Sequence, residues 1–388
     1  MMAVKILWWI TLFLIIEAMV GYPLSLLLLR KGLHIQPNRK DYSYEPPVTV
    51  MVVAHNEEKV ILEKLNNLQE LHYPPEKIKV LVTSDCSTDN TNAIVRDFIA
   101  AHPGCDIRLH ETVEHKGKTN AQNEAQRLVD TELLILTDAN AMLDRDAVRE
   151  LAASFSEENI AYVSGQLVYL NTDDNSTANS EGIYWKMDLM CREIESELQT
   201  ITAGNGAIYA VRNDAYIEIP PVECHDSSFP VLFALQRKRA IYNKDAIAYE
   251  KAGEIDEDEF KRKVRMNRDI LREILPDVSI LNVSKYKWFS YFYFGHRTCR
   301  YLLWALHIIL LALTIALLPE GLFWKIMFAA QIAFYSVAAF GWACKVQNRI
   351  VRMMTYYCMT IAAQCKGVIN ILTGRSKPVW EKAESTRE

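Results

Sequence analysis

Residues 48–58, VTVMVVAHNEE, decide the fold of this chain. The first seven are apolar or β-branched and too few for a helix, so they predict a strand buried on both faces. A polar turn follows, and apolar side chains then recur at helical spacing at Val60, Ile61, Leu65 and Leu68. The stretch therefore predicts a strand, a polar turn and a helix, in that order.

The same unit recurs downstream. Residues 78–83 form a second predicted strand, residues 84–90 (SDCSTDN) a polar turn, and residues 91–101 a helix with one apolar face. Further strands are expected at residues 107–110 and 133–136, and a further helix at residues 120–129. Alternating strands and helices predict an α/β fold with a mostly parallel central sheet, in which ligands bind beyond the carboxyl ends of the strands.

Apolar stretches flank this core. Residues 6–29 are long enough to cross ~30 Å of hydrocarbon as a helix. Residues 301–318 and 322–343 are two more, separated by a Pro-Glu-Gly break, and predict a membrane hairpin. Residues 354–372 contain Gln, Lys and Asn, which are costly in lipid, so both an interfacial helix and a fourth span are open.

Basic residues set the expected orientation. Only Lys5 precedes the first apolar stretch, whereas four cations at positions 30, 31, 39 and 40 follow it, and three more follow the hairpin. Cytoplasmic segments carry this excess, so the central domain is expected at the cytoplasmic face of the cell (inner) membrane. The expected divisions are a first membrane helix (1–30), a catalytic domain (46–252), an amphipathic segment (253–290), a hairpin (301–344) and the final helix (354–372).

Bulk composition excludes some classes of protein. Charged residues make up 23% of the 388 residues and the net charge is −5, which does not fit a nucleic-acid-binding protein. The eight cysteines form no CxxC pair and no zinc-binding spacing with histidine. We therefore expect reduced thiols and no disulfide framework.

Three turns on the predicted sheet edge carry acidic side chains, among them Asp85 and Asp138. Each turn alone has a structural explanation, because such residues cap helices and form Asx-turns. Three on the same edge favour a site for a charged, metal-bound ligand.

The ordered motifs VTVMVVAHNEE, SDCSTDNT, HKGKTNAQNEA, LTDANAML, GNGAIYAVR, CHDSSFP and FKRKVRM resemble family 2 glycosyltransferases. Within that family the chain looks most like the membrane-bound branch of hyaluronan, cellulose and exopolysaccharide synthases. The resemblance implies a GT-A fold and an inverting transfer of sugar from a nucleoside diphosphate donor, with a UDP-sugar expected first.

On this resemblance the donor-binding residues are Ala54, Asn56, Glu57, Asp85, Lys118, Asp138 and Arg265. Asp138 and Asn140 match the family's D-x-D metal motif, which implies Mg2+ or Mn2+ because hard oxygen ligands suit these cations. Asn140 departs from the pattern, since an acid is commonest there. Arg265 matches the Arg of the Q-x-x-R-W segment, although its basic run also suits a solvated face or a membrane-surface helix.

Asp226 matches the family's catalytic base, which removes the proton of the attacking acceptor hydroxyl; a single displacement of this kind inverts the anomeric centre. Its structural alternative is a cap for a helix starting near Phe229. His225 stands where an acid is usual. Gly204, Asn205 and Gly206 form, by resemblance, a loop on the acceptor side together with His225.

The expected partners are a nucleotide-sugar donor, a carbohydrate or lipid-linked acceptor and the bilayer, with export partners or a homo-oligomer also open. The leading interpretation is transfer to a growing polysaccharide or lipid-linked acceptor. The alternatives are a single-addition enzyme acting on a lipid carrier and a non-catalytic nucleotide-binding membrane scaffold.

Overall fold

The computed structural model describes residues 1–33, 35, 37–170, 178–251 and 256–376. They divide into two compact units. The sheet unit comprises the described residues within 35–171 and 192–253, and the helical unit comprises those within 1–34, 172–191 and 254–376. Helix α7, Ala178–Leu198, contributes to both units. The domain predicted as one continuous range, 46–252, therefore gives part of a long helix to the helical unit.

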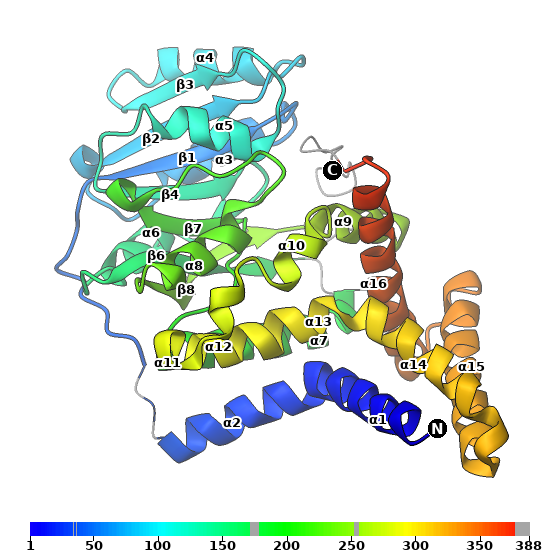
Figure 1. The fold of residues 1–388 in the computed structure, drawn as a ribbon. Coiled ribbons are helices and arrows are strands. Elements are labelled where there is room, and N and C mark those ends of the chain that lie inside the picture. Colours follow the sequence, from blue (N-terminus) through cyan, green and yellow to red (C-terminus); the bar gives the residue numbers. More distant parts are fainter. Residues whose placement is uncertain (34, 36, 171–177, 252–255, 377–388) are drawn as a thin grey trace. The chain divides into compact units, whose positions relative to one another are not determined.

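An eight-stranded sheet forms the sheet unit, in the order β3-β2-β1-β4-β7-β6-β8-β5 (Figure 1). The strands are β1 Val48–Ala54, β2 Ile78–Ser84, β3 Ile107–Glu111, β4 Leu133–Asp138, β5 Met142–Leu143, β6 Ile160–Tyr169, β7 Ile208–Arg212 and β8 Arg239–Glu250. β1, β2, β3 and β4 are mutually parallel, as are β6 and β8, and β7 joins the two sets by antiparallel pairing. The predicted α/β class and mostly parallel sheet are confirmed.

Helices cover the sheet, as the alternating pattern predicts. They are α3 Ile61–Gln69, α4 Thr91–Ala101, α5 Lys118–Gln126, α6 Ala147–Ala153 and α8 His225–Leu235, with short 3-10 turns at Pro75–Lys77 and Asn213–Ala215. All seven residues of β1 are buried, because helices and neighbouring strands surround it; α5 packs against β1 and β2. The strand predicted from residues 48–54 is thus the centre of the core.

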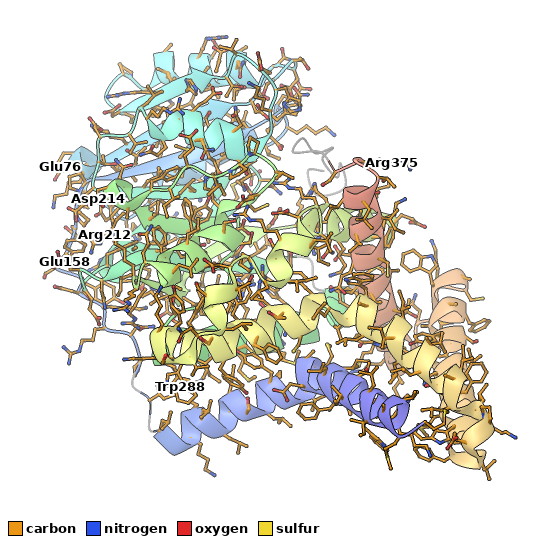
Figure 2. The ribbon with its side chains drawn as sticks, viewed as in Figure 1. Glu76, Glu158, Arg212, Asp214, Trp288 and Arg375 are labelled. Atoms are coloured by element: carbon orange, nitrogen blue, oxygen red, sulfur yellow. The ribbon has the colours of Figure 1, made fainter. Side chains whose placement is uncertain are left out.

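The edge where the parallel strands begin is held by Arg212, which lies in the part of the sheet unit that also carries Glu158 and Asp214 in Figure 2. Its guanidinium donates to the carbonyl oxygens of Ile160 at 2.9 Å and Phe155 at 2.8 Å. These bonds join the end of β7 to the start of β6. The opposite edge, where β1, β2 and β4 end, carries the polar turns.

The helical unit contains α1 Met2–Ile16, a π-helical turn Glu17–Gly21, α2 Tyr22–Leu33, α9 Asp256–Met266, α10 Ile270–Ile274, a 3-10 turn Val278–Leu281, α11 Val283–Tyr286, α12 Trp288–Phe292, a π-helical turn Tyr293–Thr298, α13 Cys299–Tyr301, α14 Leu303–Leu317, a 3-10 turn Leu318–Glu320, α15 Leu322–Ala343 and α16 Arg349–Leu372. Gly21 is the last residue of the first π-helical turn. A Cβ at this position would lie 2.1 Å from a carboxyl oxygen of Glu17. That glycine makes room for an acidic side chain in an otherwise apolar helix.

Three segments of the described chain are long and apolar enough to cross a membrane: Met2–Leu33, Leu303–Glu320 and Leu322–Ala343. Helix α16 is not among these three segments, and residues 354–372 remain predicted as an interfacial helix or a fourth span. Polar side chains inside the apolar helices bond to one another. His307 on α14 contacts the hydroxyls of Tyr335 on α15 and Tyr357 on α16, each at 2.7 Å.

Candidate active site

The polar turns meet at one edge of the sheet because the strands before them are in register. Ala54 at the end of β1 is level with Ser84 at the end of β2, and Val53 is level with Asp138 at the end of β4. Residues that follow these strands therefore lie side by side, at the carboxyl ends where α/β sheets bind ligands. The placement predicted from sequence for Asn56, Asp85 and Asp138 agrees with this geometry.

The turns after β1 and β2 are bonded to each other. Asn56 has a positive φ of 56°, a left-handed conformation that Asn tolerates better than most residues. From there its side-chain oxygen accepts from the backbone N–H of Thr88 at 2.7 Å, and its own N–H donates to Ser87 Oγ at 3.0 Å. The buried Glu57 donates its N–H to Thr91 Oγ1 at 2.7 Å, at the start of α4. We call residues 55–58 and 84–91 together the turn pair.

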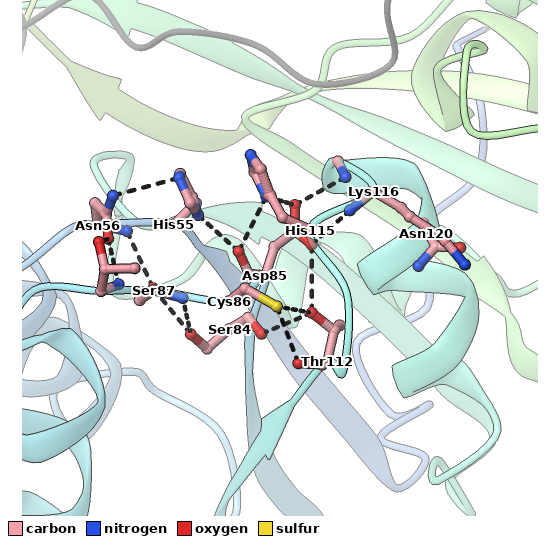
Figure 3. A network of polar contacts seen from close by, with 12 residues as sticks. His55, Asn56, Ser84, Asp85, Cys86, Ser87, Thr112, His115, Lys116 and Asn120 are labelled. Atoms are coloured by element: carbon pink, nitrogen blue, oxygen red, sulfur yellow. Dashed lines mark hydrogen bonds and ion pairs between the residues drawn. The ribbon is translucent and has the colours of Figure 1, made fainter.

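Asp85 lies at this edge and is fully buried; Figure 3 shows its polar contacts. Its carboxylate accepts from the N–H of Gly117 at 2.9 Å and pairs with His115 Nδ1 at 2.8 Å. Gly117 has φ of 95°, which only glycine adopts readily, and it turns the chain into α5. The ring of His115 stacks on that of His55, 4.0 Å between centroids. The contact between Asp85 and a nucleobase remains a prediction.

Lys118, the first residue of α5, is the centre of the charged part of the site. Its ammonium pairs with the carboxylate of Asp138 and donates to the carbonyl of Gly206 at 3.3 Å. Burial alone would lower the pKa of Lys118, but the charge and hydrogen bond of Asp138, followed by the charge of Asp226, raise it above its usual value. Lys118 therefore stays protonated between two carboxylates. We call Lys118, Asp138 and Asp226 the charged cluster.

Asp226 lies in the first turn of α8, which begins at His225, so the structural alternative of a cap before a helix starting near Phe229 does not hold. The N-cap position is Cys224, whose side chain makes no capping bond. Asp226 faces the glycine loop: a Cβ added to Gly206 would lie 3.4 Å from Asp226 Oδ2 and 3.7 Å from Lys118 Nζ. The absent side chain of Gly206 thus leaves an open approach to both charges.

The loop of Gly204, Asn205 and Gly206 fixes the backbone next to Asp226. Gly204 donates its N–H to the Asp226 carbonyl at 2.6 Å, and Asn205 Oδ1 accepts from Ala207 N–H at 2.9 Å. A Cβ on Gly204 would lie 1.8 Å from the hydroxyl of Tyr162, so any larger residue there would clash with a buried ring. The loop is therefore held from both sides.

His225 points into the protein and not toward the open side of the site. Its ring nitrogens contact Gln122 Oε1 at 2.8 Å, Asn123 Oδ1 at 3.0 Å and the hydroxyl of Tyr216 at 2.8 Å. Burial, followed by the charge of Lys118, lowers its pKa to about 3. A neutral, buried ring that joins α8 to α5 supports the position of the adjacent Asp226; direct acceptor contact by His225 remains only a prediction.

The sequence did not point to Glu250 or to Lys64, and the structure places both next to the D-x-D residues. Asn140 donates its amide to the carboxylate of Glu250, the last residue of β8. Lys64 on α3 is completely buried, donates to Thr137 Oγ1 at 3.0 Å and also bonds to the carbonyl of Ala141. A signal for Lys64 was present, because it occupies the apolar face of its helix three residues after Ile61. No local signal connects positions 140 and 250.

The residues at the end of β4 fit a divalent cation. Asp138 is about a third exposed and Asn140 is half-buried, so hard oxygen atoms face the edge where a donor would lie. Among the described residues no cluster of three or more His, Cys, Asp or Glu has metal-binding geometry.

The predicted diphosphate ligand Arg265 belongs to the helical unit, on α9. Neighbouring cations on that helix have partners within the unit: Arg262 pairs with Glu259 at 2.6 Å, and the ammonium of Lys263 lies 4.6 Å from the ring centre of Tyr356 on α16. The contact of Arg265 with a donor stays a prediction. All eight cysteines are free thiols, as expected.

Comparison with known proteins agrees with this geometry. The mannosyltransferase PcManGT of Pyrobaculum calidifontis, solved with GDP-Man and Mn2+, superposes with a TM-score of 0.72 over 95% of this chain and 99% of that one, at 23% identity. The likeness shows the fold, GT-A, including the flanking helices.

Sequence relatives cover less. The beta-monoglucosyldiacylglycerol synthase of Nostoc sp. is 26% identical over 163 residues, 42% of this chain and 35% of the relative. The poly-beta-1,6-N-acetyl-D-glucosamine synthase of Staphylococcus epidermidis is 29% identical over 100 residues, 26% of this chain and 23% of the relative. The chain thus spans about a third or less of these curated relatives. The family described as glycosyl transferase family 2 matches residues 49–219. Residues 49–219 of this chain are therefore similar to a family 2 glycosyltransferase domain.

Proposed function

We propose that this protein transfers a sugar, with inversion, from a nucleoside diphosphate donor to a hydroxyl of a lipid-linked or carbohydrate acceptor at the cytoplasmic face of a membrane. The observation that carries the proposal is the charged cluster: Lys118 pairs with Asp138 and lies in the field of Asp226, beside an open glycine. The three charges come from β4, α5 and α8, so the fold has gathered them from distant positions.

Asp226 is the proposed base. Asp226 lies in the first turn of α8, where the N-terminal end of the helix dipole favours negative charge. It would accept the proton of the acceptor hydroxyl as that oxygen attacks the anomeric carbon. Asp138 pairs with Lys118, and the donor diphosphate would leave next to this pair. A base on one side and a leaving group on the other give a single displacement, hence inversion.

Asp138 would hold Mg2+ or Mn2+, with Asn140 as a neutral oxygen ligand; when bound, the cation stabilises the charge that builds up on the departing diphosphate. Lys118 would turn from Asp138 to the phosphate oxygens once a donor is bound. A lysine is suited to this exchange because its ammonium is a compact point charge on a flexible stem.

The cytoplasmic placement has support in the helical unit. The ammonium of Lys5, at the start of α1, lies 2.7 Å from a carboxylate oxygen of Glu320, in the turn between α14 and α15. Trp8 Nε1 donates to Thr314 Oγ1 at 2.7 Å, so α1 and α14 run side by side. The Lys5 end of α1 and the hairpin turn would therefore face the same side of the membrane. The basic residues at and after the end of α2 would then face the opposite side of the membrane, which the positive-inside rule makes cytoplasmic.

A single addition to a lipid acceptor is the second candidate. Three apolar helices of the described chain can span a membrane, fewer than expected of one chain that builds a polysaccharide pore. One of the relatives is named for a lipid product, and another for a polysaccharide. Product length on a lipid acceptor separates these two: one sugar per acceptor supports single addition, and a ladder of products supports repeated addition.

Incubation of the purified full chain, in lipid nanodiscs with Mn2+, with a panel of UDP- and GDP-sugars tests the proposed function. Release of nucleoside diphosphate, together with mass gain in a lipid extract, is expected for one donor class, and excess chelator should stop it. No release from any donor, or full activity with chelator, would overturn the proposal.

The cytoplasmic placement has its own test. A cysteine introduced by Val113→Cys, at a side chain that is 93% exposed, should be labelled by an impermeant reagent only after cell lysis.

A further inference from the structure

The cation motif of this chain contains only one acid. Asp138 is followed two residues later by Asn140, whose neutral amide stands where a second carboxylate is commonest. A divalent cation held by one carboxylate has less opposing charge than one held by two, and metal affinity rises with ligand charge. A nearby carboxylate that the motif does not include would restore that charge.

Glu250 is such a carboxylate, and the sheet places it there. β5 and β8 pair antiparallel, with Met142 opposite Tyr249 and Leu143 opposite Ala248. Glu250 directly follows Tyr249 on β8, and its carboxylate accepts from the amide of Asn140, two residues before Met142. The backbone of Glu250 is also fixed from its other side, because its carbonyl accepts from Leu170 N–H at 3.0 Å.

The orientation of Asn140 follows from this neighbour. An ionised carboxylate only accepts hydrogen bonds, so the NH2 group of Asn140 must face Glu250, as it does. The amide oxygen is then directed away from Glu250. The contact thus sets which atom of Asn140 a cation would meet, and it brings the side chains of residues 140 and 250 together at the edge of the site.

The buried Lys64 lies next to the same motif and is affected by both carboxylates, Asp138 and Glu250. Its ammonium is buried beneath the end of β4, where it bonds to the residues on either side of the motif, Thr137 and Ala141. Burial lowers its pKa to about 7, while the charges of Asp138 and Glu250 both oppose that shift. Asp138 and Glu250 are therefore close to the same buried cation, one from β4 and one from β8.

We propose that Glu250 supplies the second carboxylate of the divalent-cation site, in place of the acid that is absent at Asn140. The inference rests on the proposed cation-assisted transfer. Two carboxylates, one amide oxygen and the diphosphate of the donor then form the oxygen-rich set that Mg2+ and Mn2+ prefer. The position of Glu250, far from the motif in sequence, explains how a D-x-N chain holds the cation.

Binding of Mn2+ without turnover tests this proposal. Free Mn2+ is quantified by electron paramagnetic resonance as it is titrated into the full chain in nanodiscs with GDP or UDP, and no sugar is present. Glu250→Gln keeps the shape and removes the charge, so the dissociation constant for Mn2+ should rise about 10- to 100-fold. Glu111→Gln, a carboxylate loss at the end of β3 where Glu111 pairs with Arg96, should leave it unchanged.

Rescue makes the test specific. In the double variant Asn140→Asp with Glu250→Gln the acid returns to the motif, and Mn2+ affinity should recover to within about threefold of the wild type, since the summed charge is restored. Equal Mn2+ affinity in the wild type and Glu250→Gln, with affinity lost in Asp138→Asn, would overturn the role of Glu250 alone. A wild-type chain that binds no Mn2+ with either nucleotide would instead contradict the proposed cofactor.

Discussion

The turn pair and the charged cluster lie on the same edge of the sheet but are built differently. In the turn pair, side-chain oxygens such as Asn56 Oδ1 and Asp85 Oδ2 accept from backbone N–H groups of neighbouring loops. In the charged cluster, Lys118 pairs with the carboxylate of Asp138, and the charge of Asp226 also acts on it. Bonds of the first kind fix a loop; contacts of the second kind exchange when a charged ligand arrives. The polar residues of these motifs therefore have two roles: the turn pair is a scaffold that fixes loops, and the charged cluster is the reactive part.

The largest expected effect belongs to the charged cluster. Asp226→Asn keeps the side-chain shape but cannot accept a proton, so kcat should fall about 10²- to 10⁴-fold. Donor affinity, measured by calorimetry on the full chain, should stay within about threefold, because the base acts on the acceptor. Near-normal turnover of this variant would show that Asp226 is not the catalytic base.

Lys118→Met should have a smaller effect on turnover. A hydrogen bond to a charged group contributes about 1.5–3 kcal/mol, which corresponds to a roughly 10- to 100-fold loss of kcat/KM. Lys118→Arg, which retains the charge, should recover part of it. If Lys118→Met lowers the unfolding midpoint and leaves kcat/KM intact, the lysine belongs to the scaffold instead.

The turn pair should respond in stability and not in chemistry. Asn56→Gly removes the acceptor of the Thr88 N–H and should cost about 1–3 kcal/mol of unfolding free energy. Asn56→Ala should cost about 1 kcal/mol more, since alanine is strained at the positive φ of this position. Denaturant unfolding measures both values, and kcat per folded molecule should change little. A loss of kcat at unchanged stability would contradict the comparison.

His225 should make the stability of the fold depend on pH. Its native pKa of about 3 lies below the usual 6.5, so below pH 6.5 the unfolded chain binds a proton that the native chain does not. Stability therefore falls with falling pH, by about 2 kcal/mol between pH 7 and pH 5. His225→Asn should lack this component in parallel unfolding curves. Identical pH slopes for both proteins would show that His225 is protonated in the fold.

Local patterns predicted much of the fold. The apolar run of residues 48–54 and the polar turns after it and after residues 78–83 are short-range signals, and helix Thr91–Ala101 appears with the bounds expected. The positions of Asn56, Asp85 and Asp138 at one edge of the sheet followed from topology, because parallel strands end together.

Other features depend on contacts between distant residues. The side chain of His225, the first residue of helix α8, contacts Gln122 and Asn123 on α5, which are about a hundred positions away in the sequence. Asn140 meets Glu250 only through the pairing of β5 with β8. No local pattern contains such pairings, so these parts of the site emerged only from the folded chain.

The stereochemistry of the product tests the central claim most directly. If Asp226 acts as the only base in one displacement opposite the leaving diphosphate, an α-linked nucleotide sugar must give a β-linked product. Nuclear magnetic resonance of the anomeric proton, in product formed by the wild-type chain from the donor found in the panel, measures this. The account predicts β-linked product from the first turnover. An α-linked product would contradict it, because retention requires a different arrangement of groups around the anomeric carbon.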